Sequence, residues 1–242
     1  GKTYEEYLND NFFIPLEMEN TLYGNTSPTI KNRVSGYHKK VDEFTNADYV
    51  SMTQPYAAGG LLSNVKDLFK WYEAIMNDKV ISKKNRLKAH TSYKLKNGKP
   101  TGYGYGWHLG NIRGVPMIHH GGGISGFSTY SLYIPSKKVF VDVLSNCDGF
   151  SSQSKAFQLA AAAINQPYNW QKIHVKNDGL KKYEAVYESA EEAMRTIIVE
   201  NNKLMYVHPS GSRMQLIPFK QDSFSLIMDL QYILLKEIPK AK

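Results

Sequence analysis

The first third of the chain contains a capping signal followed by a helical pattern. Thr3 and Glu6 have the spacing of a capping box, in which each residue satisfies a backbone N–H group of the other. A helix is therefore predicted from Thr3 to about Phe13, ending before Pro15, because the residue before a proline disfavours helical geometry. Residues 20–57 are rich in Asn, Thr, Ser and Tyr and are predicted to be irregular.

Apolar residues then recur every three or four positions over residues 64–77, which predicts an amphipathic helix with Ser63 as its N-cap. The middle of the chain is different, because its short strand-like runs are separated by turn residues. The predicted strands are 103–109, 115–120, 128–134 and 139–145, with turns at 97–98, 111–114 and 135–138. An alanine-rich helix is predicted over 157–164. An antiparallel meander closed by a helix is an α+β arrangement.

The last third of the chain is β-rich. Residues 167–179 are interpreted as a linker between a first domain, residues 1–166, and a second, residues 180–242. Turn signals at 201–202 and 209–211 separate its short strand candidates. These candidates are 196–200, 203–208, 214–218, 224–228 and 232–235.

The glycine run after His120 is the most informative local feature. Three glycines, Gly121 to Gly123, follow the histidine at once, and a new strand-like stretch begins at Phe127. Residues without side chains let a ligand approach the backbone, and N–H groups at a strand edge are the donors that a developing oxyanion needs. The alternative is an ordinary hairpin turn beside a histidine that is there by chance.

Composition narrows the class of protein. The chain has 242 residues, 42% of them hydrophobic, and no apolar run of membrane-spanning length. Its one cysteine, Cys147, excludes an internal disulfide and a zinc cage made of cysteines. The formal net charge is +8, but the basic residues look scattered, so nucleic acid is not the expected partner. A diffuse positive field equally suits an anionic surface such as cell wall or lipid headgroups.

Other histidines and aromatic residues have ordinary structural interpretations. His119 and His120 alternate on a strand and point to opposite faces, so no metal site is expected from this pair. His108 stands among apolar and turn residues and is interpreted as structural. Tyr103 shares a strand face with Tyr105 and Trp107, which favours packing in a core or pocket wall over substrate stacking.

Several segments, taken in order, resemble one family. These are residues 1–8 with 14–21, 55–63 leading into Asp67-Leu68, the Tyr-Gly-Tyr-Gly-Trp of 103–107, and His120-Gly121-Gly122. Together they resemble the serine β-lactamase and penicillin-binding-protein-like family, in its class C, carboxypeptidase and esterase branch. The resemblance covers roughly residues 1–165, and residues 180–235 look like the start of the lipocalin-like β-domain that often follows.

The resemblance implies a β-lactamase/transpeptidase-like sheet with helices and acyl transfer through a serine acyl-enzyme, with no metal or organic cofactor. Substrates would be β-lactams, D-amino-acid peptides or esters. By the same carry-over, His120 orients the substrate or assists proton transfer, and the N–H of Gly123 is an oxyanion donor. Gly121, Gly122 and Ser125 would contact the substrate.

The family's nucleophile is expected to lie before residue 1. The Ser-x-x-Lys matches that begin at Ser63 and Ser152 are interpreted as helix N-caps. The chain is then a C-terminal portion, expected to be inert by itself. Its sheet is expected to need a missing N-terminal segment or a dimer partner, or else to have a rearranged fold. The resemblance implies a periplasmic or extracellular location. It also leaves open that the protein is anchored to the membrane through the absent N-terminus. The alternative hypothesis is a non-catalytic module that binds cell wall or a membrane surface.

Overall fold

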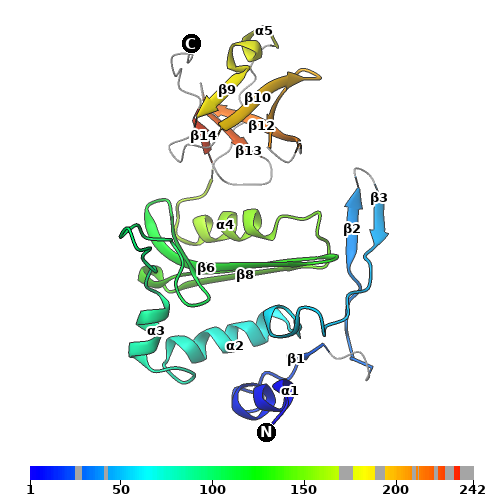
Figure 1. Ribbon diagram of the computed structural model, residues 1–242, viewed down its shortest axis with the longest axis vertical. Coiled ribbons are helices and arrows are strands. Elements are labelled where there is room, and N and C mark those ends of the chain that lie inside the picture. The colour runs from blue at the N-terminus through cyan, green and yellow to red at the C-terminus, as the bar shows by residue number, and fades with distance from the viewer. Residues whose placement is uncertain are drawn as a thin grey trace. The chain divides into compact units, whose positions relative to one another are not determined.

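The computed structural model describes residues 1–24, 29–40, 43–168, 177–188, 194–208, 211, 213–220, 223–226 and 232–234. The chain divides into two compact units, Gly1–Pro167 and Tyr168–Lys242. Figure 1 shows the elements of both units and labels most of them. No helix among these residues has the length and apolar character needed to cross a membrane.

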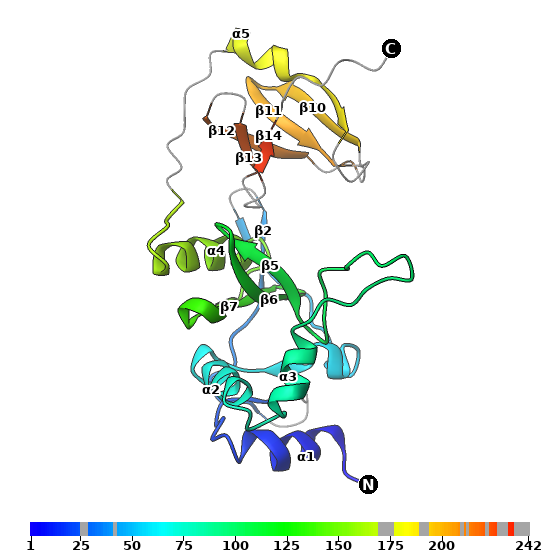
Figure 2. The same cartoon turned by 90° about the vertical axis from the view of Figure 1, so that its left-hand side faces the viewer.

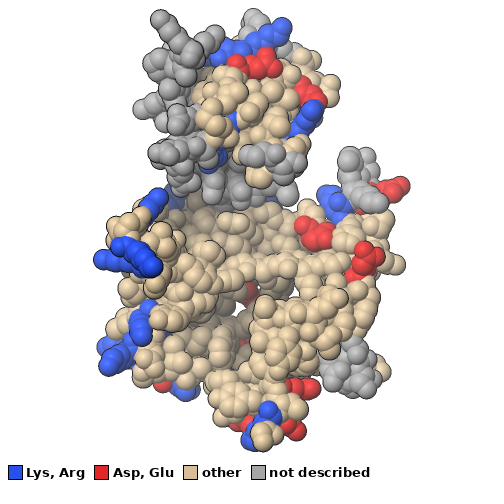
Figure 3. Space-filling model, viewed as in Figure 1, with Lys and Arg blue, Asp and Glu red and all other residues tan. Residues whose placement is uncertain are grey.

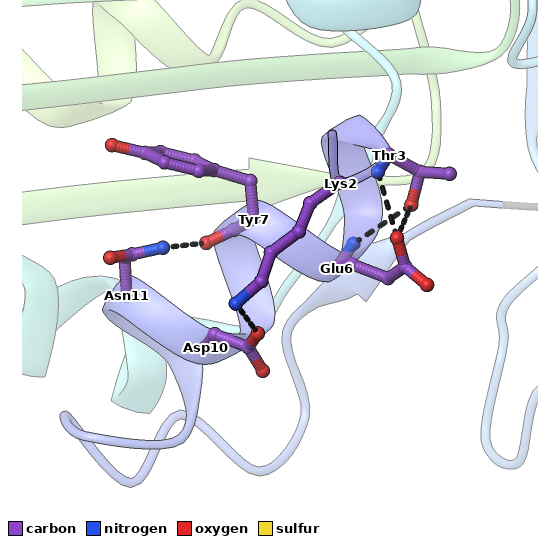
Figure 4. A network of polar contacts seen from close by, with 6 residues as sticks. All are labelled: Lys2, Thr3, Glu6, Tyr7, Asp10 and Asn11. Atoms are coloured by element: carbon purple, nitrogen blue, oxygen red, sulfur yellow. Dashed lines mark hydrogen bonds and ion pairs between the residues drawn. The ribbon is translucent and has the colours of Figure 1, made fainter.

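The first helix has the predicted capping box. Helix α1, Tyr4–Leu8, continues into a π-helical stretch, Asn9–Phe13. The Glu6 N–H donates to Thr3 Oγ1 at 3.2 Å, and the Thr3 N–H donates to Glu6 Oε2 at 2.8 Å (Figure 4). The predicted end near Phe13 is confirmed, because helical turns of one kind or the other continue to that residue.

The segment predicted to be irregular contains strands. Strand β1, Leu22–Tyr23, pairs with β4, Leu61–Leu62, and strands β2, Tyr37–Lys40, and β3, Glu43–Asn46, form an antiparallel hairpin. That prediction was wrong because the hairpin has no buried face to impose an apolar alternation: Phe44, for example, is 65% exposed.

Helix α2, Val65–Met76, confirms the predicted amphipathic helix. Its N-cap is Asn64, whose side chain accepts the Asp67 N–H, so the assignment of Ser63 as N-cap was wrong by one residue. The following helix, α3, Lys83–Ala89, was not predicted, because its sequence is almost entirely polar. Ser82 caps α3 by accepting the N–H of Asn85 at 3.3 Å.

The central sheet contains β5, His108–Ile112, β6, Val115–Ile124, β7, Phe127–Ile134, and β8, Val139–Ser145, in that antiparallel order. Helix α4, Ser152–Ala163, covers one face of the sheet and α2 the other (Figure 1). Leu132 and Ile134 are fully buried at the α4 face, where alanines let the helix approach closely. On the opposite face Tyr72 stacks on Phe140 with 4.3 Å between ring centroids.

Three boundaries in this region differ from the predictions. β5 begins at His108, so residues 103–107 form a glycine-rich loop and not a strand with one aromatic face. The β5–β6 turn is only residues 113–114, and β6 continues through the glycines to Ile124. Helix α4 begins at Ser152, five residues earlier than expected, and its N-cap is Ser151. Local composition did not predict these limits, because strand pairing and the buried α4 face set them.

The second unit contains α5, Asn177–Leu180, and a six-stranded antiparallel meander. The strands are β9, Ala185–Glu188, β10, Met194–Glu200, β11, Lys203–Val207, β12, Arg213–Lys220, β13, Ser223–Leu226, and β14, Tyr232–Leu234. Short 3₁₀ turns also occur in both units. Two are in the first unit, at Tyr56–Ala58 and Pro135–Lys137, and one is in the second, at Lys181–Tyr183. The core of this unit consists of Tyr183, Ile197, Leu204, Tyr206 and Leu216.

Five strands of the meander coincide with predicted candidates, whereas β9 was not predicted. Residues 227–228 and 235 of two candidate strands lie outside the described residues. The same is true of residues 209–210 of the predicted turn and of 169–176 in the proposed linker.

Candidate active site

The candidate site is the end of β6 that β5 leaves uncovered. The turn at residues 113–114 has positive φ at both positions, +52° and +80°, as in a type I′ turn. Such a turn closes on a hydrogen-bonded pair, so the odd-numbered residues of β6 direct their N–H groups toward β5. The β5–β6 register ends at His108 and His119. The N–H groups of Gly121 and Gly123 therefore point to the uncovered edge of β6.

His120 lies at the beginning of this uncovered edge, and its side chain is exposed. Its Nδ1 is 2.7 Å from the carbonyl oxygen of Gly121, and its Nε2 is 3.0 Å from the hydroxyl of Tyr103. A carbonyl can only accept, so Nδ1 carries the proton, and in the neutral ring Nε2 accepts the Tyr103 hydroxyl. The pair is thus arranged for a proton to pass between a phenol and an imidazole at the surface.

Sequence reasoning missed two members of this group. Tyr103 was interpreted as packing, and His108 as an isolated structural residue. In the structure the centroid of the His108 ring lies 5.4 Å from the ring centroids of both His119 and His120. It lies 4.5 Å from the ring centroid of Tyr103. The signal that could have found this cluster is the two-residue turn, which sets His108 opposite His119.

His119 points to the opposite face from His120, as predicted. Its ring contacts Phe157 of α4, and its Nδ1 forms a hydrogen bond of 2.7 Å with the hydroxyl of Tyr130. Among the described residues, no group of three or more His, Cys, Asp or Glu side chains could hold a metal ion.

A polar row crosses the sheet on the same face as His120. His120 is paired with Ser131, and Ser131 with Asp142 on the next strand. The Ser131 hydroxyl donates to one Asp142 oxygen at 2.5 Å, whereas the other oxygen is buried with no hydrogen-bond partner among the described residues. Burial raises the pKa of Asp142, and the hydrogen bond from Ser131 opposes that shift.

The remaining predicted residues lie nearby along the chain. Gly122 faces Thr129 of β7, and Ser125 forms the two-residue β6–β7 turn with Gly126. The Gly126 N–H donates to Asp148 Oδ2 at 3.1 Å, which connects the turn to the segment after β8.

Neither Ser-x-x-Lys match has the surroundings of a nucleophile. Ser152 is fully buried, and its hydroxyl donates to the carbonyl of Ser128 at 2.7 Å. Ser63 Oγ lies 2.7 Å from Thr21 Oγ1, between α2 and the N-terminal segment. Neither serine is the N-cap that was predicted, but both hydroxyls have structural hydrogen bonds.

Comparison with known proteins shows which family the chain belongs to. The family model described as Beta-lactamase matches residues 1–164. The chain is 28% identical to penicillin-binding protein 4* of Bacillus subtilis (strain 168), over 93% of this chain and 55% of that protein. It is 25% identical to a D-aminopeptidase of Gluconobacter oxydans (strain 621H), over 69% of this chain and 32% of that protein.

A solved structure has the same fold. The octameric penicillin-binding protein homologue from Pyrococcus abyssi matches with a TM-score of 0.62 and 24% identity, over 97% of this chain and 57% of that one. The class is therefore a β-lactamase and penicillin-binding-protein-like fold. The chain belongs to the Beta-lactamase family. It spans about half the length of the Bacillus relative and a third of the Gluconobacter one.

The surroundings of His119 predict acid sensitivity. Burial and then the nearby His108 and His120 rings lower the pKa of His119 to about 4. The folded-state pKa lies below the unfolded value, so this contribution to stability is present above about pH 6.5 and is lost as the pH falls toward 4. For a half-buried ring screened by solvent we expect about 1–2 kcal/mol. Urea unfolding at pH 7.5 and 4.5 should show that His119→Gln loses less stability on acidification than the parent; equal losses would contradict the assignment.

Proposed function

We propose that this chain forms part of a serine hydrolase that acts on β-lactam, D-amino-acid peptide or ester carbonyls through an acyl-enzyme. The observation that carries the proposal is the Tyr103–His120 hydrogen bond at the uncovered glycine edge of β6, in a chain whose residues 1–164 match the Beta-lactamase family. The name D-aminopeptidase of one relative favours substrates that contain D-amino acids. Such substrates occur in cell-wall peptides, so we also propose a periplasmic or extracellular location.

In this proposal each group at the edge has one role. A serine oxygen attacks the carbonyl carbon, the bond to the leaving nitrogen or oxygen breaks, and water later hydrolyses the acyl-enzyme. The N–H of Gly123 stabilises the oxyanion, and Gly121 and Gly122 leave room for the substrate beside the strand. His120, oriented by Tyr103, moves a proton to the leaving group or orients the substrate. Ser125 contacts a polar group of the substrate from the β6–β7 turn.

The attacking serine is assigned to a segment outside residues 1–242 or to a partner chain, because Ser63 and Ser152 are occupied in structural hydrogen bonds. No organic cofactor or metal is part of the proposal. The alternative, a non-catalytic module at a cell wall or membrane surface, makes no use of the glycine edge.

Covalent labelling tests the proposal. Residues 1–242 alone should not be labelled by a fluorescent penicillin or a fluorophosphonate, whereas the complete protein expressed from its gene should be labelled at a serine outside this chain. In the complete protein, His120→Ala should slow acylation by about 10²–10⁴-fold and Tyr103→Phe by about fivefold to tenfold. Tyr105→Phe is the matched control, because Tyr105 is 66% exposed and outside the group.

Two results would contradict the proposal. Stoichiometric labelling of residues 1–242 at any serine would place the nucleophile inside the chain. Acylation that is equally fast in the His120→Ala, Tyr103→Phe and Tyr105→Phe variants would remove the pair from the mechanism.

A further inference from the structure

The acidic residues of the chain are distributed far less evenly than the basic ones. Between Asp78 and Asp142 there is no Asp or Glu in 63 consecutive residues, 79–141, which contain 11 Lys and Arg. The rest of the chain carries all 22 acidic residues against 19 basic ones. The positive charge of the whole protein therefore comes from this one stretch, although its basic residues look scattered when the sequence is read by their positions alone.

The structure gathers six of these lysines on α3 and on the hairpin that follows it. We call the hairpin of residues 92–102 the basic finger; Figure 2 shows it as a long loop standing away from the sheet between α3 and β5. The six exposed lysines are Lys83, Lys84 and Lys88 of α3 and Lys94, Lys96 and Lys99 of the finger. Figure 3 shows Lys and Arg side chains along the edge of residues 1–167 where Figure 1 draws α3.

These lysines are not neutralised within the described part of the chain. Within residues 79–141, Arg86 forms an ion pair with Asp78, at 2.8 Å. None of the six lysines has a carboxylate within ion-pair distance among the described residues. A set of unpaired, exposed cations that extends over two adjacent elements produces a local positive field that favours an anionic partner.

The finger is an ordered hairpin. The Tyr93 N–H donates to the Tyr103 carbonyl at 2.8 Å, and the Leu95 N–H donates to the Lys99 carbonyl at 2.9 Å. At its base the Tyr105 N–H donates to the carbonyl of Ala89, the last residue of α3, at 3.1 Å. The last of these bonds fixes the base of the finger to the end of α3, so the two sets of lysines lie on adjoining elements.

Large apolar side chains alternate with the lysines on the finger. Tyr93 is 67% exposed and Leu95 is 47% exposed, and they flank Lys94 and precede Lys96. Tyrosine favours the interface between lipid and water, and the transfer of an exposed leucine into the acyl region lowers the free energy. Lysines beside them are attracted to anionic headgroups. A free polyanion would use the lysines but would give the apolar side chains nothing to bind.

We propose that α3 and the basic finger dock this protein on the surface of an anionic lipid bilayer, with Tyr93 and Leu95 entering the interface. The partner is a membrane surface and not a spanning segment. Because Tyr103 at the base of the finger bonds His120, docking would hold the uncovered edge of β6 close to the membrane. This inference does not depend on the proposed chemistry, since it rests on a different surface.

Vesicle flotation tests the docking surface. The full chain should float with vesicles of phosphatidylglycerol and phosphatidylcholine in equal parts at 0.15 M salt, and should not float with phosphatidylcholine alone. Replacing Lys94, Lys96 and Lys99 together by Gln should lower the partition coefficient about 100-fold, since each lysine at an anionic surface contributes roughly a fivefold effect. The matched control replaces Lys31, Lys66 and Lys155, which are exposed and outside residues 79–141, and should change it less than fivefold.

A second pair of measurements separates a bilayer from a soluble polyanion. Tyr93→Ser with Leu95→Ser should weaken binding to the anionic vesicles about tenfold or more and leave binding to soluble polyphosphate unchanged. No binding to anionic vesicles, or equal effects of the two lysine triples, would overturn the proposal. The proposal would also be overturned if the Tyr93→Ser, Leu95→Ser variant bound the vesicles as tightly as the parent. That result would indicate a polyanion partner.

Discussion

Gly126→Ala is expected to lower the free energy of unfolding by about 3 kcal/mol or more. Gly126 has φ +78°, and a Cβ there would lie 2.4 Å from the Ala47 Cβ and 2.8 Å from the Gly36 backbone. The left-handed conformation costs a side-chain-bearing residue about 1–2 kcal/mol, and the forced displacement of neighbours adds about 1–3 kcal/mol. The same turn is held by Asp148, which accepts the Gly126 N–H, and by the Tyr37 N–H, which donates to the Gly126 carbonyl at 3.3 Å.

Gly114→Ala is the control that separates conformation from collision. Gly114 has φ +80°, and a Cβ there would meet nothing within 4 Å, so only the conformational cost of about 1–2 kcal/mol applies. Urea unfolding of the two variants beside the parent measures the difference. If both variants lost the same stability, Gly36 and Ala47 would not be packed on the β6–β7 turn in solution, and the turn that carries Ser125 would lack that support.

Asp67→Ala is expected to cost about 2–4 kcal/mol, because Asp67 is a buried acceptor. Its side chain is 1% exposed, and its Oδ2 accepts the Asn20 N–H at 2.7 Å and the Thr21 hydroxyl at 3.0 Å. Removing the acceptor leaves these donors without that partner in a part-buried setting, at about 1–3 kcal/mol for each unsatisfied group. These bonds connect α2 to the segment after the first helix, so the loss should appear in the main unfolding transition of residues 1–167.

The matched control is Asp10→Ala. Asp10 pairs with Lys2 at 2.5 Å, but both side chains are about half exposed, and an exposed ion pair contributes little. Its removal should leave the urea midpoint unchanged within error. A loss for Asp67→Ala no larger than that for Asp10→Ala would mean that the buried carboxylate does not hold the two segments together.

The sequence predicts those structural features of this protein that depend on residues close together in the chain, and it misses features that depend on tertiary packing. The Thr3–Glu6 capping box and helix α2 follow from residues three or four apart, and both were predicted. The β2–β3 hairpin was missed because its strands bury no face that would show in their pattern. Helix α3 was missed because its sequence, with a single leucine between lysines, has no apolar stripe.

The candidate site shows the same limit at a finer scale. His120 and the three glycines were identified from their order along the chain, and the structure puts them on one strand. A predicted four-residue turn at 111–114 would set His108 opposite Met117, whereas the two-residue turn sets it opposite His119. That change of register brings the His108 ring into the cluster, and it depends on turn geometry that composition alone did not specify.

The sequence by itself determined the β-lactamase-like family, the α+β class, the helices with local signals and the histidine with its glycines, because these depend on neighbouring residues and on their order. It also contains the acid-free stretch that makes the protein basic. Only the tertiary structure decided that Tyr103 bonds His120, that Ser131 and Asp142 form a row with it, and that the base of the basic finger is bonded to the end of α3. The contacts of His120 and Ser131 join residues 11 to 17 positions apart, so they depend on strand register and packing, which no local pattern encodes.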